Sequence, residues 1–241
     1  MQSESVLPKV SIHPAQSPGA GRSLRITEIF YSLQGETRTA GLPTVFVRLT
    51  GCPLRCQYCD TAYAFQGGEF MSLPEILAQV ASYAPYREEW EPPRYVTVTG
   101  GEPLAQKACL ELLNALCDTG YEVSLETGGA MDVAAVDPRV VKILDIKTPG
   151  SDESDKNLYG NIEYLTPRDQ VKFVLCSRED YVWAKEIMAR YDLPARCEIL
   201  FSPSHQQMAA TSLADWILED RLPVRLQIQL HKYLWGNTPG K

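Results

Sequence analysis

Residues 44–61 read TVFVRLTGCPLRCQYCDT, and this stretch decides how the rest of the chain is interpreted. Its first half is rich in β-branched and aromatic residues, which predicts a strand over 44–50. Its second half places Cys52, Cys56 and Cys59 on one short loop directly after that strand, with the spacing C-x3-C-x2-C. Three thiols delivered to one loop by a strand predict a metal site at the end of that strand.

Strand-like and helical segments alternate along the remaining chain. This alternation predicts βαβ units with parallel pairing, and about six such units would give a barrel-like sheet that need not close. Further strands are expected at residues 25–30, 95–99, 122–126, 140–146, 171–175, 198–201 and 224–230. Helices are expected after Ser72 and at residues 106–119, 178–191 and 211–218, whereas the polar segment 150–165 is expected to be a loop.

Size and composition favour one domain. The chain has 241 residues, of which 44% are hydrophobic, enough for one sizeable core. Residues 1–23 are rich in Ser, Pro, Gly and Gln and are expected to form a disordered N-terminal extension, which leaves 24–241 as the core domain. The net charge, 23 − 30 = −7, argues against nucleic-acid or anionic-membrane partners.

The number of cysteines and their expected compartment are also compatible with a metal site. No apolar run of membrane-spanning or export-signal length is present, so a cytoplasmic location is expected, where thiols stay reduced. The seven cysteines then indicate metal chemistry, redox chemistry or plain burial rather than a disulfide framework. Isolated cysteines, expected to be structural, are Cys109, Cys117, Cys176 and Cys197.

The three clustered thiolates can ligate three irons of a 4Fe–4S cubane. The fourth iron then lacks a protein ligand, and a small molecule offering an amino nitrogen and a carboxylate oxygen could chelate it. The alternative is a zinc site, which would need a fourth Cys or His if it were closed. The only histidines of the chain are His13, His205 and His231, and no second cysteine pair follows.

A second motif, VTVTGGEP at residues 96–103, is a strand that ends in two glycines, Glu102 and Pro103. The glycines allow a ligand to approach the backbone, although an ordinary strand-to-helix turn would look the same. Together with the cysteine loop about 40 residues earlier, and with Tyr58 before the last cysteine, the motif resembles the radical S-adenosylmethionine (SAM) superfamily. The resemblance implies a partial (β/α)6 TIM-like barrel. It also implies a 4Fe–4S cluster that, when reduced, cleaves SAM to a 5′-deoxyadenosyl radical.

Four further segments narrow the resemblance. They are EIFYSLQGE at 28–36, VFVRL at 45–49, CDT at 59–61 and QIQLHK at 227–232. From Leu24 onward the chain resembles the 7-carboxy-7-deazaguanine synthase (QueE) family of queuosine and deazapurine biosynthesis. The resemblance implies a lyase that contracts the ring of 6-carboxy-5,6,7,8-tetrahydropterin, releases ammonia and regenerates SAM. Mg²⁺, a flavodoxin-like reductant and a homodimer are implied as well.

The resemblance also assigns roles to individual residues, and no catalytic side chain is expected beyond the cluster and SAM. Substrate contacts are expected from Leu33, Gln34, Gly35, Arg48, Thr99 and Pro239. SAM contacts are expected from Gln57, Tyr58, Cys59, Asp60, Gly101, Glu102, Asp145, Lys147, Ser202 and Gln206. Thr61 is expected to ligate Mg²⁺, with its neutral hard oxygen.

Simpler interpretations of several of these residues remain open. Arg48 could form a surface ion pair, Thr61 could be a helix N-cap, and Lys147 could be solvated. His231 and Lys232 could contact substrate or lie at the rim of the site. Two other functions are also compatible with parts of the pattern. One is an activase that makes a glycyl radical on a partner protein, and the other is a zinc-binding interaction module.

Overall fold

The computed structural model describes residues 23–83, 95–236, 238 and 240. The strands are β1 (Ser23–Leu33), β2 (Pro43–Leu49), β3 (Glu69–Ser72), β4 (Tyr95–Gly100), β5 (Glu122–Thr127), β6 (Val141–Asp145), β7 (Gln170–Leu175), β8 (Glu198–Pro203) and β9 (Arg225–Leu226). The helices are α1 (Leu73–Tyr83), α2 (Cys109–Asp118), α3 (Arg178–Arg190), α4 (Ala210–Glu219) and α5 (Leu230–Trp235). No helix in these ranges is long and apolar enough to span a membrane.

Within the described ranges, all strands belong to one sheet in the order β3-β1-β2-β4-β5-β6-β7-β8-β9. From β2 to β9 each strand pairs in parallel with the next, whereas β1 pairs antiparallel with both β2 and β3. The parallel part is the expected partial barrel, and it stays open because β3 and β9 end the order without pairing with each other.

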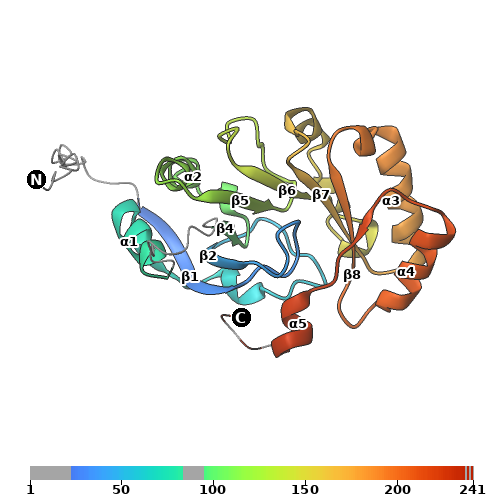
Figure 1. Cartoon of the computed structure of the whole chain (residues 1–241), viewed down its shortest axis with the longest axis horizontal. Helices are drawn as coiled ribbons and strands as arrows, with labels where there is room; N and C mark the ends of the chain where they lie inside the picture. The colour runs from blue at the N-terminus through green and yellow to red at the C-terminus, as the bar shows by residue number, and fades with distance from the viewer. Residues whose placement is uncertain (1–22, 84–94, 237, 239, 241) are drawn as a thin grey trace, which may run out of the picture.

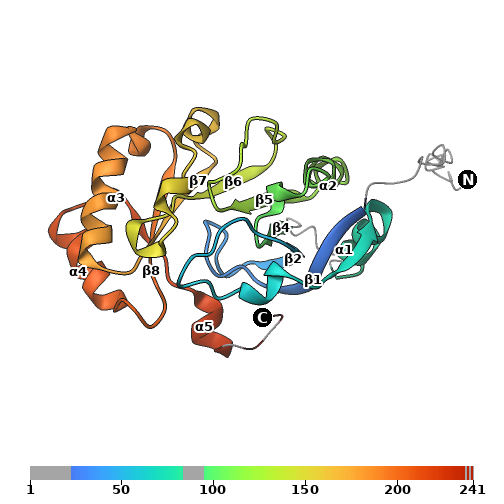
Figure 2. The same cartoon turned by 180° about the vertical axis from the view of Figure 1, so that it is seen from behind.

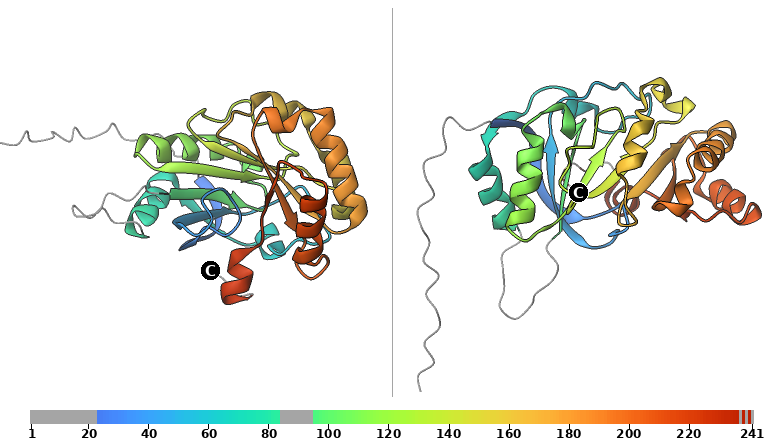
Figure 3. Two further views of the ribbon diagram at one scale, coloured as in Figure 1. Left: turned by 45° about the vertical axis from the view of Figure 1, so that its right-hand side comes forward. Right: turned by 90° about the horizontal axis from the view of Figure 1, so that it is seen from above.

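Helices α1 to α4 cover the outer side of the curved sheet, whereas α5 contributes residues to the cavity (Figures 1 and 2). Helices α1 and α2 lie beside the end formed by β1, β2, β4 and β5, and α3 and α4 lie beside β7 and β8. The view from above in Figure 3 shows the same division. Four crossovers of the described chain carry an α-helix, whereas those from β5 to β6 and from β6 to β7 use loops and short 3-10 turns.

Period-2 alternation gives the sheet two chemically different faces. On β2, Val45, Val47 and Leu49 are fully buried in the core beneath the helices. The side chains between them, Phe46 and Arg48, line a cavity on the inner face. Because successive side chains of a strand point to opposite faces, one set of strands supplies both an apolar core and a polar cavity wall.

Local capping agrees with the expected helix starts. The Glu75 carboxylate accepts hydrogen bonds from the Ser72 backbone N–H (2.8 Å) and hydroxyl (2.6 Å) at the start of α1. The Ser177 hydroxyl accepts from the Asp180 N–H at the start of α3. Helix α2 begins later than expected, because the Gln106 side chain bonds the backbones of Arg25 and Thr50 and stays outside the helix.

Two expectations near the sheet edges differ from the structure. The strand expected at 224–230 is limited to Arg225–Leu226, because the chain then turns so that Gln227 can donate to the Gly35 carbonyl (3.0 Å). The short edge strand β3 was not expected, since four residues carry too little periodicity to be recognised. Strand β1 begins at Ser23, one residue before the expected domain boundary, and residues 1–22 lie outside the described part.

Candidate active site

A cavity of about 730 Å³ lies on the inner face of the sheet, within the size range of small-molecule sites. Its wall combines the cysteine loop, the carboxyl ends of the parallel strands, the turn after β1 and residues of α5. All expected site residues within the described chain line it: Leu33, Gln34, Gly35, Arg48, Cys52, Cys56, Gln57, Tyr58, Cys59, Asp60, Thr61, Thr99, Gly101, Glu102, Asp145, Lys147, Ser202 and Gln206. Pro239 lies outside the described residues.

Cys52, Cys56 and Cys59 are half-buried free thiols that line this cavity together. The Gly51 N–H donates to the Ala64 carbonyl (2.8 Å), and the Arg55 guanidinium donates to the Cys52 carbonyl (2.7 Å), which fixes the loop around them. Burial raises the pKa of Cys56 to about 11 and also raises the pKa of Cys52, although nearby Lys147 opposes both shifts. Metal binding at these positions would therefore displace protons.

The cysteine loop suits a cluster better than a single ion. In the described part of the chain, no three His, Cys, Asp or Glu side chains gather closely enough to ligate one metal ion. A closed zinc site requires four converging ligands. A 4Fe–4S cubane instead takes each thiolate on a different iron, so its ligands surround a larger group. Three thiols lining one cavity fit that donor set.

The glycines after β4 allow the cysteine loop to pack directly on the strand end. A Cβ on Gly101 would lie 2.3 Å from the Gly51 carbonyl oxygen and 2.8 Å from the Cys52 Cβ. The Glu102 N–H donates to the same Gly51 carbonyl (2.8 Å). Only a glycine permits this approach, so the second motif directly supports the first.

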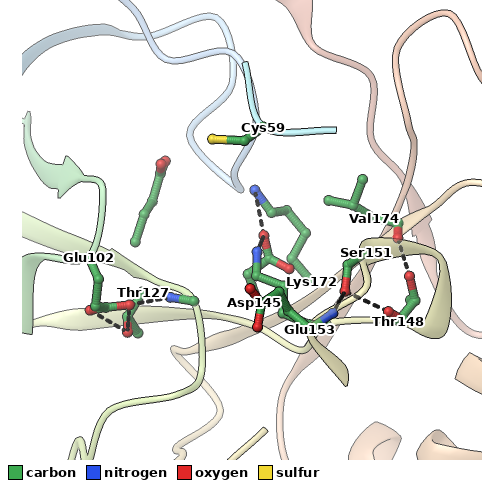
Figure 4. A network of polar contacts seen from close by, with 12 residues as sticks. Cys59, Glu102, Thr127, Asp145, Thr148, Ser151, Glu153, Lys172 and Val174 are labelled. Carbon is green, nitrogen blue, oxygen red and sulfur yellow. Dashed lines mark hydrogen bonds and ion pairs between the residues drawn. The ribbon is translucent and has the colours of Figure 1, made fainter. Parts of the chain in front are cut away.

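Glu102 has a structural role that the sequence did not indicate. Its fully buried carboxylate accepts from the Leu104 N–H (3.0 Å), the Gly128 N–H (2.7 Å) and the Thr127 hydroxyl (2.9 and 3.0 Å). Burial raises its pKa in spite of these bonds. Figure 4 shows Glu102 and Thr127 to one side of Asp145 and Lys172, with Cys59 facing them. Glu102 thus joins the ends of β4 and β5.

Among the residues expected to contact SAM, some polar groups already have a partner within the protein and others have none. Within the described chain, the Tyr58 hydroxyl and Asp145 Oδ1 are buried without a hydrogen-bond partner. Such groups suit a polar ligand in the cavity. Lys147 is buried and pairs with Asp145 Oδ2 at 2.9 Å, so it is not the solvated lysine of the simpler interpretation.

The other expected SAM contacts lie at the edge of the site. The Gln57 side chain exchanges hydrogen bonds with Gln207 (3.1 and 2.9 Å), which ties the cysteine loop to the loop after β8. Ser202 is buried at the end of β8, and Gln206 is exposed with a left-handed backbone (φ 66°). Asp60 accepts from Gln229 at 3.0 Å and pairs with Lys232 at 3.4 Å.

The turn after β1 forms another part of the cavity wall. The Gln34 side chain accepts from the backbone N–H groups of Gly35 (2.8 Å) and Glu36 (3.0 Å) and donates to Thr97 (3.1 Å) and Glu126 (3.3 Å). Gln34 therefore shapes the turn with its side chain, while Leu33 and Gly35 line the cavity beside it.

Arg48 and Thr99 come from neighbouring strands. Arg48 Nε donates to Glu28 at 2.7 Å, and its guanidinium lies 5.8 Å from the Phe30 ring and 6.0 Å from the Tyr63 ring. It does form the ion pair of the simpler interpretation, but at the cavity wall rather than on the outer surface. The Thr99 hydroxyl donates to Glu126 at 3.1 Å.

Thr61 occupies the N-cap position of the short 3-10 helix Ala62–Phe65, yet its side chain makes no capping hydrogen bond. Its Oγ1 lies 3.7 Å from the Cys59 sulfur. Thr61 thus stands at the N-cap position that the simpler interpretation gave it, but its hydroxyl does not cap the helix. The oxygen is therefore suited to a hard cation in the cavity.

Four charged residues of the cavity were given no role by the sequence: Glu28, Glu36, Glu126 and Lys172. Lys172 had a usable signal, because it interrupts the apolar run of β7 and a charge inside a buried strand needs a partner. Glu36 ends the quoted segment 28–36 and Glu126 ends the strand expected at 122–126, but their partners come from distant parts of the chain. His231 and Lys232 also line the cavity, and His231 Nδ1 is 3.9 Å from Glu36 Oε1.

Comparison with known proteins gives a consistent set of matches. A family profile described as the radical SAM superfamily matches residues 46–194. A protein of Chlorobaculum tepidum named 7-carboxy-7-deazaguanine synthase is 46% identical over 217 residues, covering 88% of this chain and 94% of the relative. A protein of the same name from Koribacter versatilis is 41% identical over 226 residues, covering 88% and 97%.

Solved structures support the fold alone. The crystal structure of QueE from Escherichia coli is similar with a TM-score of 0.68 at 23% identity, covering 86% of this chain and 94% of that one. Streptococcus suis SuiB bound to its precursor peptide SuiA is similar with a TM-score of 0.53 at 12% identity, covering 74% and 46%.

Proposed function

Because the chain belongs to the radical SAM superfamily and, within it, to the 7-carboxy-7-deazaguanine synthase family, we propose that it converts 6-carboxy-5,6,7,8-tetrahydropterin to 7-carboxy-7-deazaguanine with loss of ammonia. The observation that carries this proposal is the 46% identity to a named relative over 94% of that relative's length. The family accounts for a 4Fe–4S cluster and SAM as cofactors. The glycyl-radical activase is not favoured, since many relatives carry the synthase name.

In this proposal the cysteine loop holds the cluster through Cys52, Cys56 and Cys59. When bound there, the cluster and SAM would supply the radical chemistry that removes a hydrogen atom from the substrate. The side chains and backbone of the cavity bind and orient SAM and the substrate. Gly101, which lines the cavity, would contact SAM, and its missing side chain lets the cysteine loop pack against the end of β4. The unpaired Asp145 Oδ1 and Tyr58 hydroxyl would supply polar contacts to SAM.

On the substrate side, Arg48 would hold the carboxylate of the pterin. Its ion pair with Glu28 uses Nε, and the guanidinium carries four more N–H donors in a planar fork. The turn Leu33–Gly35 and Thr99 would border the pterin ring, and Thr61 would ligate a Mg²⁺ ion. The half-enclosed cavity would keep bulk water away from the reacting atoms.

We also propose a flavodoxin-like protein as the reductant, a homodimer as the working form and the cytoplasm as the location. The pterin is a small molecule, so no nucleic-acid or membrane contact is required.

The direct test is turnover of carboxytetrahydropterin by anaerobically reconstituted protein with SAM, Mg²⁺ and a chemical reductant, followed by mass spectrometry. The expected product is 7-carboxy-7-deazaguanine, with SAM not consumed. Absence of this product, with and without Mg²⁺, would show that the proposed substrate is wrong. Iron and sulfide contents near four each, rather than one zinc, separate the enzyme from a zinc-binding interaction module.

Cys56→Ser should abolish both the visible absorbance of the cluster and turnover, because it removes one of three iron ligands. Cys117→Ser is the matched control, since Cys117 lies on α2 away from the cavity and should keep both properties. Full turnover by Cys56→Ser would contradict the cluster assignment.

A further inference from the structure

Lys172 occupies an unusual position on the inner face of β7. Its side chain is 9% exposed, and its Nζ lies 3.1 Å from Glu36 Oε2 and 3.7 Å from Asp145 Oδ2. Glu126, at the end of β5, also interacts electrostatically with it. Three carboxylates from three separate segments therefore share one buried ammonium group, and Figure 4 shows Lys172 beside Asp145 on the strand side of the site.

The three carboxylates do not depend on Lys172 equally. Asp145 has a cation of its own, because Lys147 Nζ lies 2.9 Å from its Oδ2. Glu126 accepts neutral hydrogen bonds from Thr99 and Gln34, and Arg48 also lowers its pKa electrostatically. Glu36 accepts one neutral hydrogen bond from Gln229 (2.9 Å), lies 3.9 Å from His231 Nδ1, and has Lys172 as its nearest cation at 3.1 Å. Removing Lys172 should therefore affect Glu36 most.

The electrostatic balance at Glu36 agrees with this ranking. Burial by itself would raise the pKa of the Glu36 carboxyl, but Lys172, together with Gln229 and His231, lowers that pKa to about 2. At Glu126 burial prevails, and its pKa is raised. The other charged or titratable groups facing Lys172 are Lys147, which follows β6, and Tyr58 on the cysteine loop.

The Lys172–Glu36 ion pair lies between the parts of the cavity that the proposed function assigns to the substrate and to SAM. Glu36 follows directly on the turn Leu33–Gly35, which the proposed function assigns to the substrate. Asp145 belongs to the wall that the proposed function assigns to SAM. Lys172 touches both walls, and no other lysine or arginine of the described chain forms ion pairs with both Glu36 and Asp145.

We propose that Lys172 is a positioning residue that keeps Glu36 ionised and thereby ties the substrate turn to the SAM-binding wall. The inference rests on the proposed function only for the naming of those two walls. Lys172 on β7 therefore sets the charge state of Glu36. Through Glu36 it also sets the shape of the turn after β1.

The chain offers a matched control in Lys142 on the neighbouring strand β6. Lys142 is 5% exposed, and its Nζ lies 3.1 Å from Asp169 Oδ2. It is thus a second lysine in a buried ion pair, but it does not line the cavity. Lys142→Met removes the same kind of interaction from the same sheet without touching the site.

The test is a pH titration of the purified full-length protein followed by difference infrared spectroscopy, which detects protonated carboxyl groups without any turnover. Lys172→Met should show a new protonated carboxyl signal at mildly acidic to neutral pH, its midpoint higher than that of Glu36 in the wild type by about two pH units or more. Lys172→Arg should restore the wild-type titration. The double variant Lys172→Met/Glu36→Gln should lack the new signal.

Several outcomes would overturn the proposal. They are an unchanged titration in Lys172→Met, a new signal that persists in the double variant, or a signal in Lys142→Met that is lost when Glu36→Gln is added, because any signal from Asp169 would remain in that variant. If Lys172→Met does not fold, the neutral pair Lys172→Met/Glu36→Gln must recover folding. If it does not, Lys172 acts independently of Glu36. A shifted titration in a protein that does not turn over carboxypterin would contradict the proposed function and leave this inference intact.

Discussion

Arg48 combines an internal ion pair with a place on the cavity wall. Glu28 binds its Nε and the Phe30 and Tyr63 rings flank the guanidinium, so the side chain is held before any ligand arrives. A preorganised guanidinium loses less side-chain freedom on binding a carboxylate than a flexible one does. Lysine at this position would keep the charge but not the planar fork.

Arg48→Lys should therefore raise the KM for carboxypterin about 10- to 100-fold, which corresponds to about 1.5–3 kcal/mol for lost charge-assisted hydrogen bonds. Steady-state kinetics at saturating SAM measures this. Arg25→Lys is the control, because Arg25 stacks on Phe70 near the sheet edge and does not line the cavity. An unchanged KM in Arg48→Lys would remove Arg48 from the substrate site.

Among elements, the contact between the end of β4 and the cysteine loop is the tightest part of the site. The backbone groups of Leu49, Gly51, Gly101 and Glu102 are joined by hydrogen bonds of 3.1 and 2.8 Å. Any side chain at residue 101 must push the loop away from the strand. The geometry of the three thiols is therefore set partly by a residue that has no side chain.

Gly101→Ala should lower the free energy of unfolding by about 1–3 kcal/mol, as overpacking does, and should reduce the iron bound after reconstitution. Gly160→Ala is the control, because a Cβ there meets nothing within 4 Å, and its effect should stay within about 0.5 kcal/mol. Denaturant unfolding and iron analysis of both variants test the claim, which fails if Gly101→Ala matches the wild type in both.

The sequence predicted those parts of the elements and of the site that depend on local patterns. The cysteine loop and the glycines after β4 carry their information within a few residues, and α1 and α3 begin at the expected residues. It could not predict contacts such as Lys172 with Glu36, which join residues 136 positions apart. The early end of the last strand has the same cause: the Gln227 backbone N–H still bonds the Phe201 carbonyl of β8, but its side chain donates to Gly35, which is far away in the sequence.

Over the whole molecule, one hydrophobic cluster extends from Leu24 on β1 to Ile217 on α4. Phe173 and Phe201 pack edge to face at 5.6 Å within it, and Tyr181 packs on Phe201 at 5.9 Å. A continuous core of this kind favours cooperative unfolding. We therefore propose that residues 24–241 behave as one domain.

Leu24→Ala and Leu213→Ala, at opposite ends of the core, should each lower the free energy of unfolding by about 2–5 kcal/mol. Far-ultraviolet circular dichroism and tryptophan fluorescence of the cluster-free protein should report the same single transition for both. Leu218→Ala, where the side chain is 74% exposed, should change little. Two separate transitions would show that the sheet halves fold independently.

The turn between β1 and β2 connects the first part of the sheet to the last. Its residues contact β7 through Arg38 and Glu36, and Gly35 accepts hydrogen bonds from Gln227 and Leu230, which follow β9. During synthesis, which supplies residues from the N-terminus onward, this turn forms before its last partners exist, because Gln227 follows Gly35 by 192 residues. The ribosome must have released residues 227–230 before the substrate wall can close. A nascent chain that has not reached this point can carry all three cysteines and still lack a finished pocket.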